Sequence, residues 1–212
     1  MFKHIREPVN SLTHWAAAIL ALIGLIALLL VGWGTPAKVV SLAIYGASLI
    51  FLFSASATYH TVNRKDRVLE VFRKVDHAAI FLLIAGTYTP FCVNAFTGFW
   101  QWGLLSIIWS LALIGVLVKV FYVNSPRWLN AGIYVVMGWL GILGAGQVLT
   151  NLPVWVISWL VAGGVIYTLG AIVYSTKIFD FFPGVFGFHE IWHIFVILAA
   201  AAHFVAVLGV AL

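Results

Sequence analysis

Long apolar runs separated by short polar or turn-forming segments dominate the pattern of hydrophobic and polar positions along the chain. A run of about 20 apolar residues is long enough to cross the hydrocarbon core of a bilayer as a helix. Seven such runs predict helices over residues of about 12–32, 39–61, 76–96, 101–122, 129–149, 154–174 and 189–211. The pattern therefore predicts an all-α fold, a seven-transmembrane helix bundle that forms one membrane domain over residues 1–212.

The breaks between these runs contain residues that end helices or favour turns. Gly32, Gly34 and Pro36 follow the first run, and a charged stretch over residues 63–74 separates the second run from the third. No small-residue cleavage site is evident at the end of the first run, so we interpret that run as a retained span and not as a signal peptide.

Composition supports a membrane protein and excludes a soluble globular domain. Hydrophobic residues make up 64% of the chain and charged residues only 8%, whereas about a quarter of a typical soluble domain is charged. The single cysteine, Cys92, excludes an internal disulfide.

The distribution of lysine and arginine predicts the orientation, because cytoplasmic loops retain basic residues. We expect a cytoplasmic N-terminus and an outer C-terminus in the cell inner (plasma) membrane, which leaves only Lys38 outside. The basic residues then placed inside are Lys3, Arg6, Arg64, Lys65, Arg67, Arg73, Lys74, Lys119, Arg127 and Lys177. The net charge of +5 is explained by this topology and by anionic lipid. We therefore expect membrane lipids and no nucleic acid as partners, while no sequence feature indicates an oligomeric state.

Five polar residues interrupt the apolar runs at one predicted depth, near the cytoplasmic end of the bundle. Ser56 and His60 end the second predicted helix, Asp76 begins the third, and His189 and His193 begin the last. Residues four apart share a helix face, so the three histidines can converge on one ion. Ionisable groups at membrane depth usually face the bundle interior and mark function.

This group of side chains is typical of a zinc site. Imidazole is a preferred zinc ligand, and three histidines leave a fourth position open, as in catalytic sites. Asp76 is then expected to orient a water and accept its proton, and Ser56 to position the water or the substrate. Nickel, cobalt or iron also bind imidazole, and a purely structural network of these polar side chains is the alternative.

A second pattern overlaps the last pair of histidines. Residues 189–193 read H-E-x-x-H, the motif of zinc metalloproteases in which the glutamate is a general base. Here the motif opens the last predicted helix, and Asp76 already supplies a carboxylate. Glu190 is then expected to face the headgroups or to stabilise the helix N-terminus.

The chain resembles the hemolysin III family, the bacterial branch of the progestin and adipoQ receptor superfamily, over nearly its whole length. The residues that carry the resemblance are Glu7-Pro8-Val9-Asn10-Ser11-Leu12-Thr13-His14, Ser56-x-x-x-His60, Asp76-His77-Ala78-Ala79-Ile80, Ala85-Gly86-Thr87-Tyr88-Thr89-Pro90 and His189-x-x-x-His193. The resemblance implies seven spans with the N-terminus inside. It also implies zinc held by His60, His189 and His193, with Asp76 acting through water and Ser56 nearby.

The resemblance also limits the functional hypotheses. Related receptors are suspected of hydrolysing ceramide or other lipid amides, and bacterial members are described as hemolysins or as regulators of membrane fluidity and energetics. We therefore expect a zinc-dependent hydrolase of lipid amide or ester bonds. The alternatives are a non-catalytic regulator with structural zinc and a cytolytic pore-forming protein.

Three further polar residues, within the predicted helices or close to their ends, have less specific roles. Asn10 and His14 are expected near the metal end of the first helix, where they pack and cap it or support the metal ligands. His203 lies near mid-membrane, and we expect a hydrogen-bonded core histidine there.

Overall fold

The computed structural model is all-α, and it describes residues 5–64, 67–122, 124–182 and 185–212. Seven spans in these residues are long and apolar enough to cross a membrane, so the protein is a multi-pass membrane protein with seven candidate spans. The helices are α1 (Pro8–Val31), α2 (Pro36–Thr61), α3 (Arg67–Ala95), α4 (Phe99–Phe121), α5 (Arg127–Trp139), η1 (Leu140–Gly144), α6 (Ala145–Asn151), α7 (Val154–Thr176) and α8 (Phe188–Ala211). Together, α5, η1 and α6 form the fifth span.

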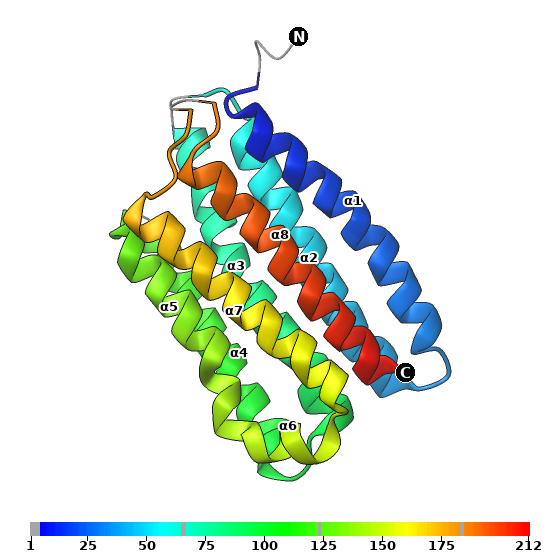
Figure 1. Ribbon diagram of the computed structural model, residues 1–212. Coiled ribbons are helices and arrows are strands. Elements are labelled where there is room, and N and C mark those ends of the chain that lie inside the picture. The colour runs from blue at the N-terminus through cyan, green and yellow to red at the C-terminus, as the bar shows by residue number, and fades with distance from the viewer. Residues whose placement is uncertain (1–4, 65–66, 123, 183–184) are drawn as a thin grey trace.

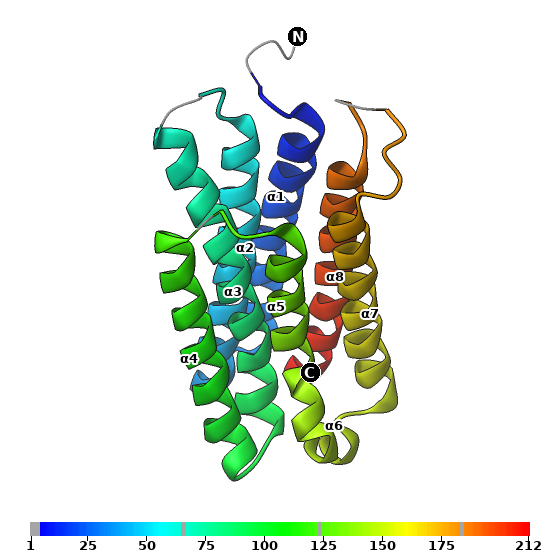
Figure 2. The ribbon, with the colours of Figure 1, turned by 90° about the vertical axis from the view of Figure 1, so that its left-hand side faces the viewer.

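The helices form one bundle, with α2 and α3 as its most buried spans. Consecutive helices α1 to α4 pack against their neighbours, and α8 packs against α7, α1 and α3. Figure 1 shows α1 in blue beside α8 in red, with the start of α1 and the end of α8 at opposite ends of the bundle. Figure 2 shows the same arrangement from the side of α4, α5 and α7.

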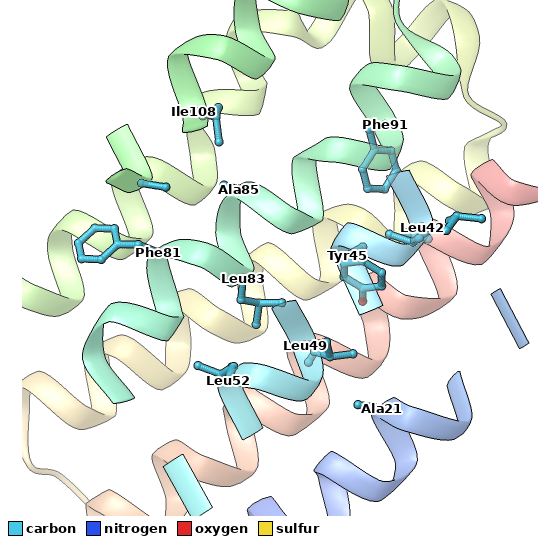
Figure 3. Close-up of a cluster of buried hydrophobic side chains, with 14 of the residues drawn as sticks. Ala21, Leu42, Tyr45, Leu49, Leu52, Phe81, Leu83, Ala85, Phe91 and Ile108 are labelled. Carbon is cyan, nitrogen blue, oxygen red and sulfur yellow. The ribbon is translucent and has the colours of Figure 1, made fainter. Parts of the chain in front are cut away.

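Close packing of α2 on α3 forms the centre of the core. Leu42, Tyr45, Leu49 and Leu52 of α2 are buried together with Leu83, Ala85 and Phe91 of α3 (Figure 3). A Cβ atom built on Gly86 would overlap the side chain of Ser48, so glycine allows the two backbones to approach. Small residues at helix contacts are typical of membrane bundles, where packing replaces the hydrophobic driving force.

One predicted boundary differs markedly from the structure. The charged stretch 63–74 was expected to separate two spans, yet α3 begins at Arg67, nine residues before the predicted start at 76. Apolar residues alternate with charged ones here, and Glu70 forms an ion pair with Lys74 one turn later, at 2.9 Å. Such a pair supports a helix in water. Asp76 therefore lies more than two turns inside α3.

The fifth span is interrupted, which its apolar pattern did not predict. The 3-10 turn η1 separates α5 from α6. The hydroxyl group of Tyr88, on α3, donates to the carbonyl oxygen of Gly138 at 2.6 Å and accepts the N–H of Gly141 at 2.6 Å. Backbone groups released by a helix break inside a membrane need such partners. Tyr88 thus stabilises the break.

The described basic residues gather at one end of the bundle. They lie before α1, at the end of α2, in the first turns of α3 and α5, near the end of α4 and after α7, and only Lys38 lies at the opposite end. Lys3 and Lys65, which the predicted orientation also used, lie outside the described residues.

Candidate metal centre

Three histidines from two helices meet at the basic end of the bundle. His60 is in the last turn of α2, and His189 and His193 are in the first turns of α8. One ring nitrogen from each lies within 4.8 Å of the others. The His60 and His193 rings are 4.6 Å apart between centroids, and only 1% of His60 and 3% of His193 is exposed. The cluster could hold a metal ion.

The hydrogen bonding of the three rings fits a metal. His189 Nε2 and His193 Nδ1 are buried and have no hydrogen-bond partner among the described residues. A buried imidazole nitrogen without a partner is costly, and coordination to a metal would satisfy it. His60 uses Nδ1 in a bond to a carboxylate and so keeps Nε2 for a metal. Three imidazoles are a donor set that zinc and other divalent transition metals bind.

That carboxylate belongs to Glu7, for which no individual role was predicted from the sequence. Glu7 precedes α1, and its Oε2 lies 2.5 Å from His60 Nδ1. Burial raises the pKa of Glu7, but the hydrogen bond and electrostatic interaction with His60 and the positive charge of Arg6 lower it from its ordinary value of 4.5 to about 2. A carboxylate on the outer nitrogen of a ligating histidine orients the ring and increases its basicity. The only sequence signal was the position of Glu7 at the start of the 7–14 motif.

Residues in the first turns of α1 contact the cluster and the two carboxylates beside it. Asn10 donates from Nδ2 to Glu190 Oε1 at 2.8 Å and to Glu7 Oε2 at 3.3 Å. The His14 ring stacks on the His193 ring, with centroids 3.9 Å apart and planes at 30°. Asn10 and His14 are therefore within reach of the ligands, and their supporting role stays a prediction.

Glu190 stabilises the N-terminus of α8. Its Oε2 accepts the backbone N–H of Gly187 at 2.8 Å, while its Oε1 accepts the amide of Asn10. This is one of the two roles expected for Glu190 from its position. Both carboxylate oxygens are engaged, which does not favour the metalloprotease reading of H-E-x-x-H.

Asp76 and Ser56 lie beside the cluster at the polar end of a large cavity. The cavity measures about 680 Å³, and its lining includes Asp76, Ser56, His189 and His193. The Asp76 carboxyl group is next to the Ser56 hydroxyl and within electrostatic reach of His60. The structure thus brings the five sequence-predicted residues together, although their roles stay predictions.

Beyond this polar end the cavity is lined mostly by apolar side chains. Its lining residues on α3 extend from Arg73 to Phe91, which at 1.5 Å per residue corresponds to about 27 Å. Leu83, Ile84 and Phe91 line it from α3, and Val196 lines it from α8. A space of this length and character suits an acyl chain.

The two remaining histidines of the spans lie outside the cluster. His203 lines the deep part of the cavity, and its Nε2 is 3.1 Å from the carbonyl oxygen of Leu160, which confirms the expected hydrogen-bonded core histidine. The carbonyl oxygen of His77 accepts the Tyr134 hydroxyl at 3.2 Å.

Comparisons with known proteins find similarity over almost the full chain. A family model described as "Haemolysin-III related" matches residues 2–204. The chain is 38% identical over 211 residues to "Hemolysin-3" of Bacillus cereus, covering 98% of this chain and 93% of the relative. It is 36% identical over 210 residues to "Hemolysin-3 homolog" of Bacillus subtilis (strain 168), covering 98% and 95%. "Adiponectin receptor protein" of Drosophila melanogaster is 28% identical over 188 residues, which cover 80% of this chain and 42% of the relative.

Proposed function

Since the chain belongs to the haemolysin-III family, with distant relatives such as the adiponectin receptor, we propose that it is a zinc-dependent hydrolase of lipid amide or ester bonds. The observation that carries this proposal is the composition of the cavity. Imidazole nitrogens without a partner among the described residues, a carboxylate and a hydroxyl meet at one end, and mostly apolar side chains line the rest. A structural metal site would not need an apolar cavity beside it.

Each residue at the polar end has a distinct task in this mechanism. His60, His189 and His193 would hold zinc, which supplies Lewis acidity and lowers the pKa of water to about 7. Asp76 accepts the proton of the attacking water and returns it to the leaving group. Ser56 hydrogen-bonds the Asp76 side chain and keeps the carboxylate in position.

The apolar part of the cavity supplies binding and orientation. Side chains such as Leu83 and Val196 hold the acyl chain and exclude bulk water, which strengthens the interactions of Asp76 with its neighbours. The lipid enters from the leaflet on the histidine side. We place that side in the cytoplasm, because the described basic residues other than Lys38 gather there, and we place the protein in the cell inner membrane.

Fatty-acid release from ceramides and other amide or ester lipids tests the proposal. Purified protein is expected to release fatty acid only with zinc bound, and Asp76→Asn is expected to abolish release while zinc content is kept. Asp180→Asn, an exposed carboxylate change, is the matched control and keeps wild-type turnover. If His60→Ala retains as much zinc as the wild type, the ligand assignment is wrong.

A non-catalytic regulator of membrane fluidity with structural zinc is the second candidate. The observation that favours it is that the cluster and its hydrogen bonds join α1, α2 and α8. No turnover on a broad lipid panel, with zinc loss lowering only the thermal stability, would favour this candidate. Ion leakage from liposomes that survives removal of the metal would instead favour a pore.

A further inference from the structure

The cavity-facing stripe of α3 changes its chemistry along the helix in a definite order. Arg73 comes first, Asp76 and His77 follow one turn later, and Ile80 and Leu83 come next. Residues three or four apart share a helix face, so these side chains line the cavity as a cation, then a polar group, then hydrocarbon. This order is complementary to an amphiphile with an anionic head.

A second cation faces the same end of the cavity from another helix. Arg127, the first residue of α5, lines the cavity and is exposed. Its guanidinium carbon lies 5.3 Å from the centre of the Phe188 ring and 5.9 Å from that of Tyr174. Aromatic rings hold a guanidinium in place without neutralising its charge.

Neither arginine forms an ion pair within the described part of the chain, and the only carboxylate found within electrostatic reach of Arg73 there is the exposed Glu70. Arg73 donates to the amide oxygen of Asn124 at 2.9 Å, which uses one of its five N–H groups. The ion pairs among the described residues join Arg6 and His60 to Glu7, and Lys74 to Glu70. Both guanidinium groups therefore keep donors and charge available for an anion.

A buried lysine increases the positive potential at this end. Lys119 of α4 is 2% exposed and donates to Asn130, which lines the cavity. It lies within electrostatic reach of Arg73 and forms no ion pair among the described residues. A buried charge without an opposite charge is costly. Asp76 is the one carboxylate in the cavity lining, and Arg73 and Arg127 are its two arginines, so the lining carries an excess of positive charge.

We propose that this cavity binds a lipid with a phosphate headgroup, which Arg73 and Arg127 hold at the mouth while the acyl chain follows the apolar stripe of α3. Phosphate fits better than carboxylate, because it carries up to two charges and offers several oxygens to two guanidinium forks. Arg73 and Asp76 are three residues apart, about 4.5 Å along the helix. The first ester or amide bond beyond the headgroup therefore lies beside Asp76. Binding of the headgroup does not depend on hydrolysis.

A binding measurement on metal-free protein tests this proposal separately from any turnover. The full chain, in an uncharged maltoside detergent with a chelator present, is titrated with lysophosphatidic acid and with the uncharged monoacylglycerol of the same chain length. We expect the phosphate lipid to bind at least roughly tenfold more tightly. Arg73→Gln and Arg127→Gln should each remove roughly tenfold of this preference.

Arg67→Gln is the matched control, because Arg67 is on the same helix but exposed and outside the cavity lining. It is expected to keep the wild-type preference. Equal binding of charged and uncharged lipid by the wild-type protein would overturn the proposal. An equal loss in Arg67→Gln would overturn it too, because the effect would then be general surface attraction. Inorganic phosphate that displaces the lipid at the same concentration would assign the site to free phosphate and refute a lipid site. Lipid preference without fatty-acid release would refute only the hydrolase.

Discussion

Replacement of Glu7 by glutamine tests whether a residue outside the histidine cluster tunes metal binding. Glutamine keeps the length of the side chain and one acceptor oxygen, so it can still accept the Nδ1–H of His60 but removes the negative charge. Loss of a second partner of a ligating histidine weakens metal binding by about 10- to 100-fold, or about 1.4 to 2.8 kcal/mol. The Glu7 side chain is 38% exposed, and because water screens its charge, we expect about tenfold for Glu7→Gln. Glu7→Ala, which also removes the acceptor oxygen, should approach the upper limit of this range, a loss of about 100-fold in metal affinity.

Competition with a zinc chelator of known affinity measures this loss on detergent-purified protein. Glu70→Gln is the control, because Glu70 pairs with Lys74 at the surface and touches none of the histidines. The stability that Glu7 contributes through its lowered pKa is present above pH 4.5 and is lost as the pH falls from 4.5 toward about 2. Glu7 is therefore ionised at neutral pH. Between about pH 6 and 8, zinc release follows histidine protonation in both proteins. The ratio of the zinc affinities of the wild type and Glu7→Gln should therefore be constant over this range. Equal affinities in Glu7→Gln and the wild type would refute the reasoning.

Three further predictions concern the surrounding fold. Glu190→Gln should lower the free energy of unfolding by about 1 kcal/mol through the weakened α8 cap, measured by thermal unfolding; if it instead abolishes turnover with zinc retained, Glu190 is the general base. Gly86→Ala should destabilise the protein by about 1–3 kcal/mol, because its Cβ overlaps Ser48, whereas Gly132→Ala, with no atom within 4 Å of the added Cβ, should be neutral or stabilising; equal effects would contradict the packing argument. A reporter fused after Leu212 should be active only on the outer side of the membrane, and cytoplasmic activity would overturn the orientation.

The spans and the histidine cluster were predictable because they depend on local rules. Apolar runs of membrane-spanning length identify helices, and pairs such as His189 and His193 share a face by helix periodicity alone. Basic residues at the helix ends then placed His60 at the same depth. None of these steps required knowledge of how distant segments pack.

Features that depend on tertiary contacts were not predictable in this way. The partner of His60 is Glu7, 53 residues away, and no local pattern links a residue before the first helix to the end of the second. The start of α3 was missed because charged residues in its first turns resemble a loop when periodicity is ignored. The break at η1 depends on the Tyr88 hydroxyl from another helix, while the composition of the fifth span alone suggests a continuous helix.

The hydrogen bond between Asn10 and Glu190 joins residues 180 positions apart, which has a consequence for biosynthesis. A ribosome that adds about 5–20 residues per second needs about 10–40 s to travel from one to the other. Until α8 is made, the membrane holds six spans and only His60 of the three histidines. The cluster is therefore complete only after the last helix has inserted between α1 and α7. A chain that stops before Phe188 cannot form it, so retention of a metal by these histidines would mark full-length, correctly assembled molecules.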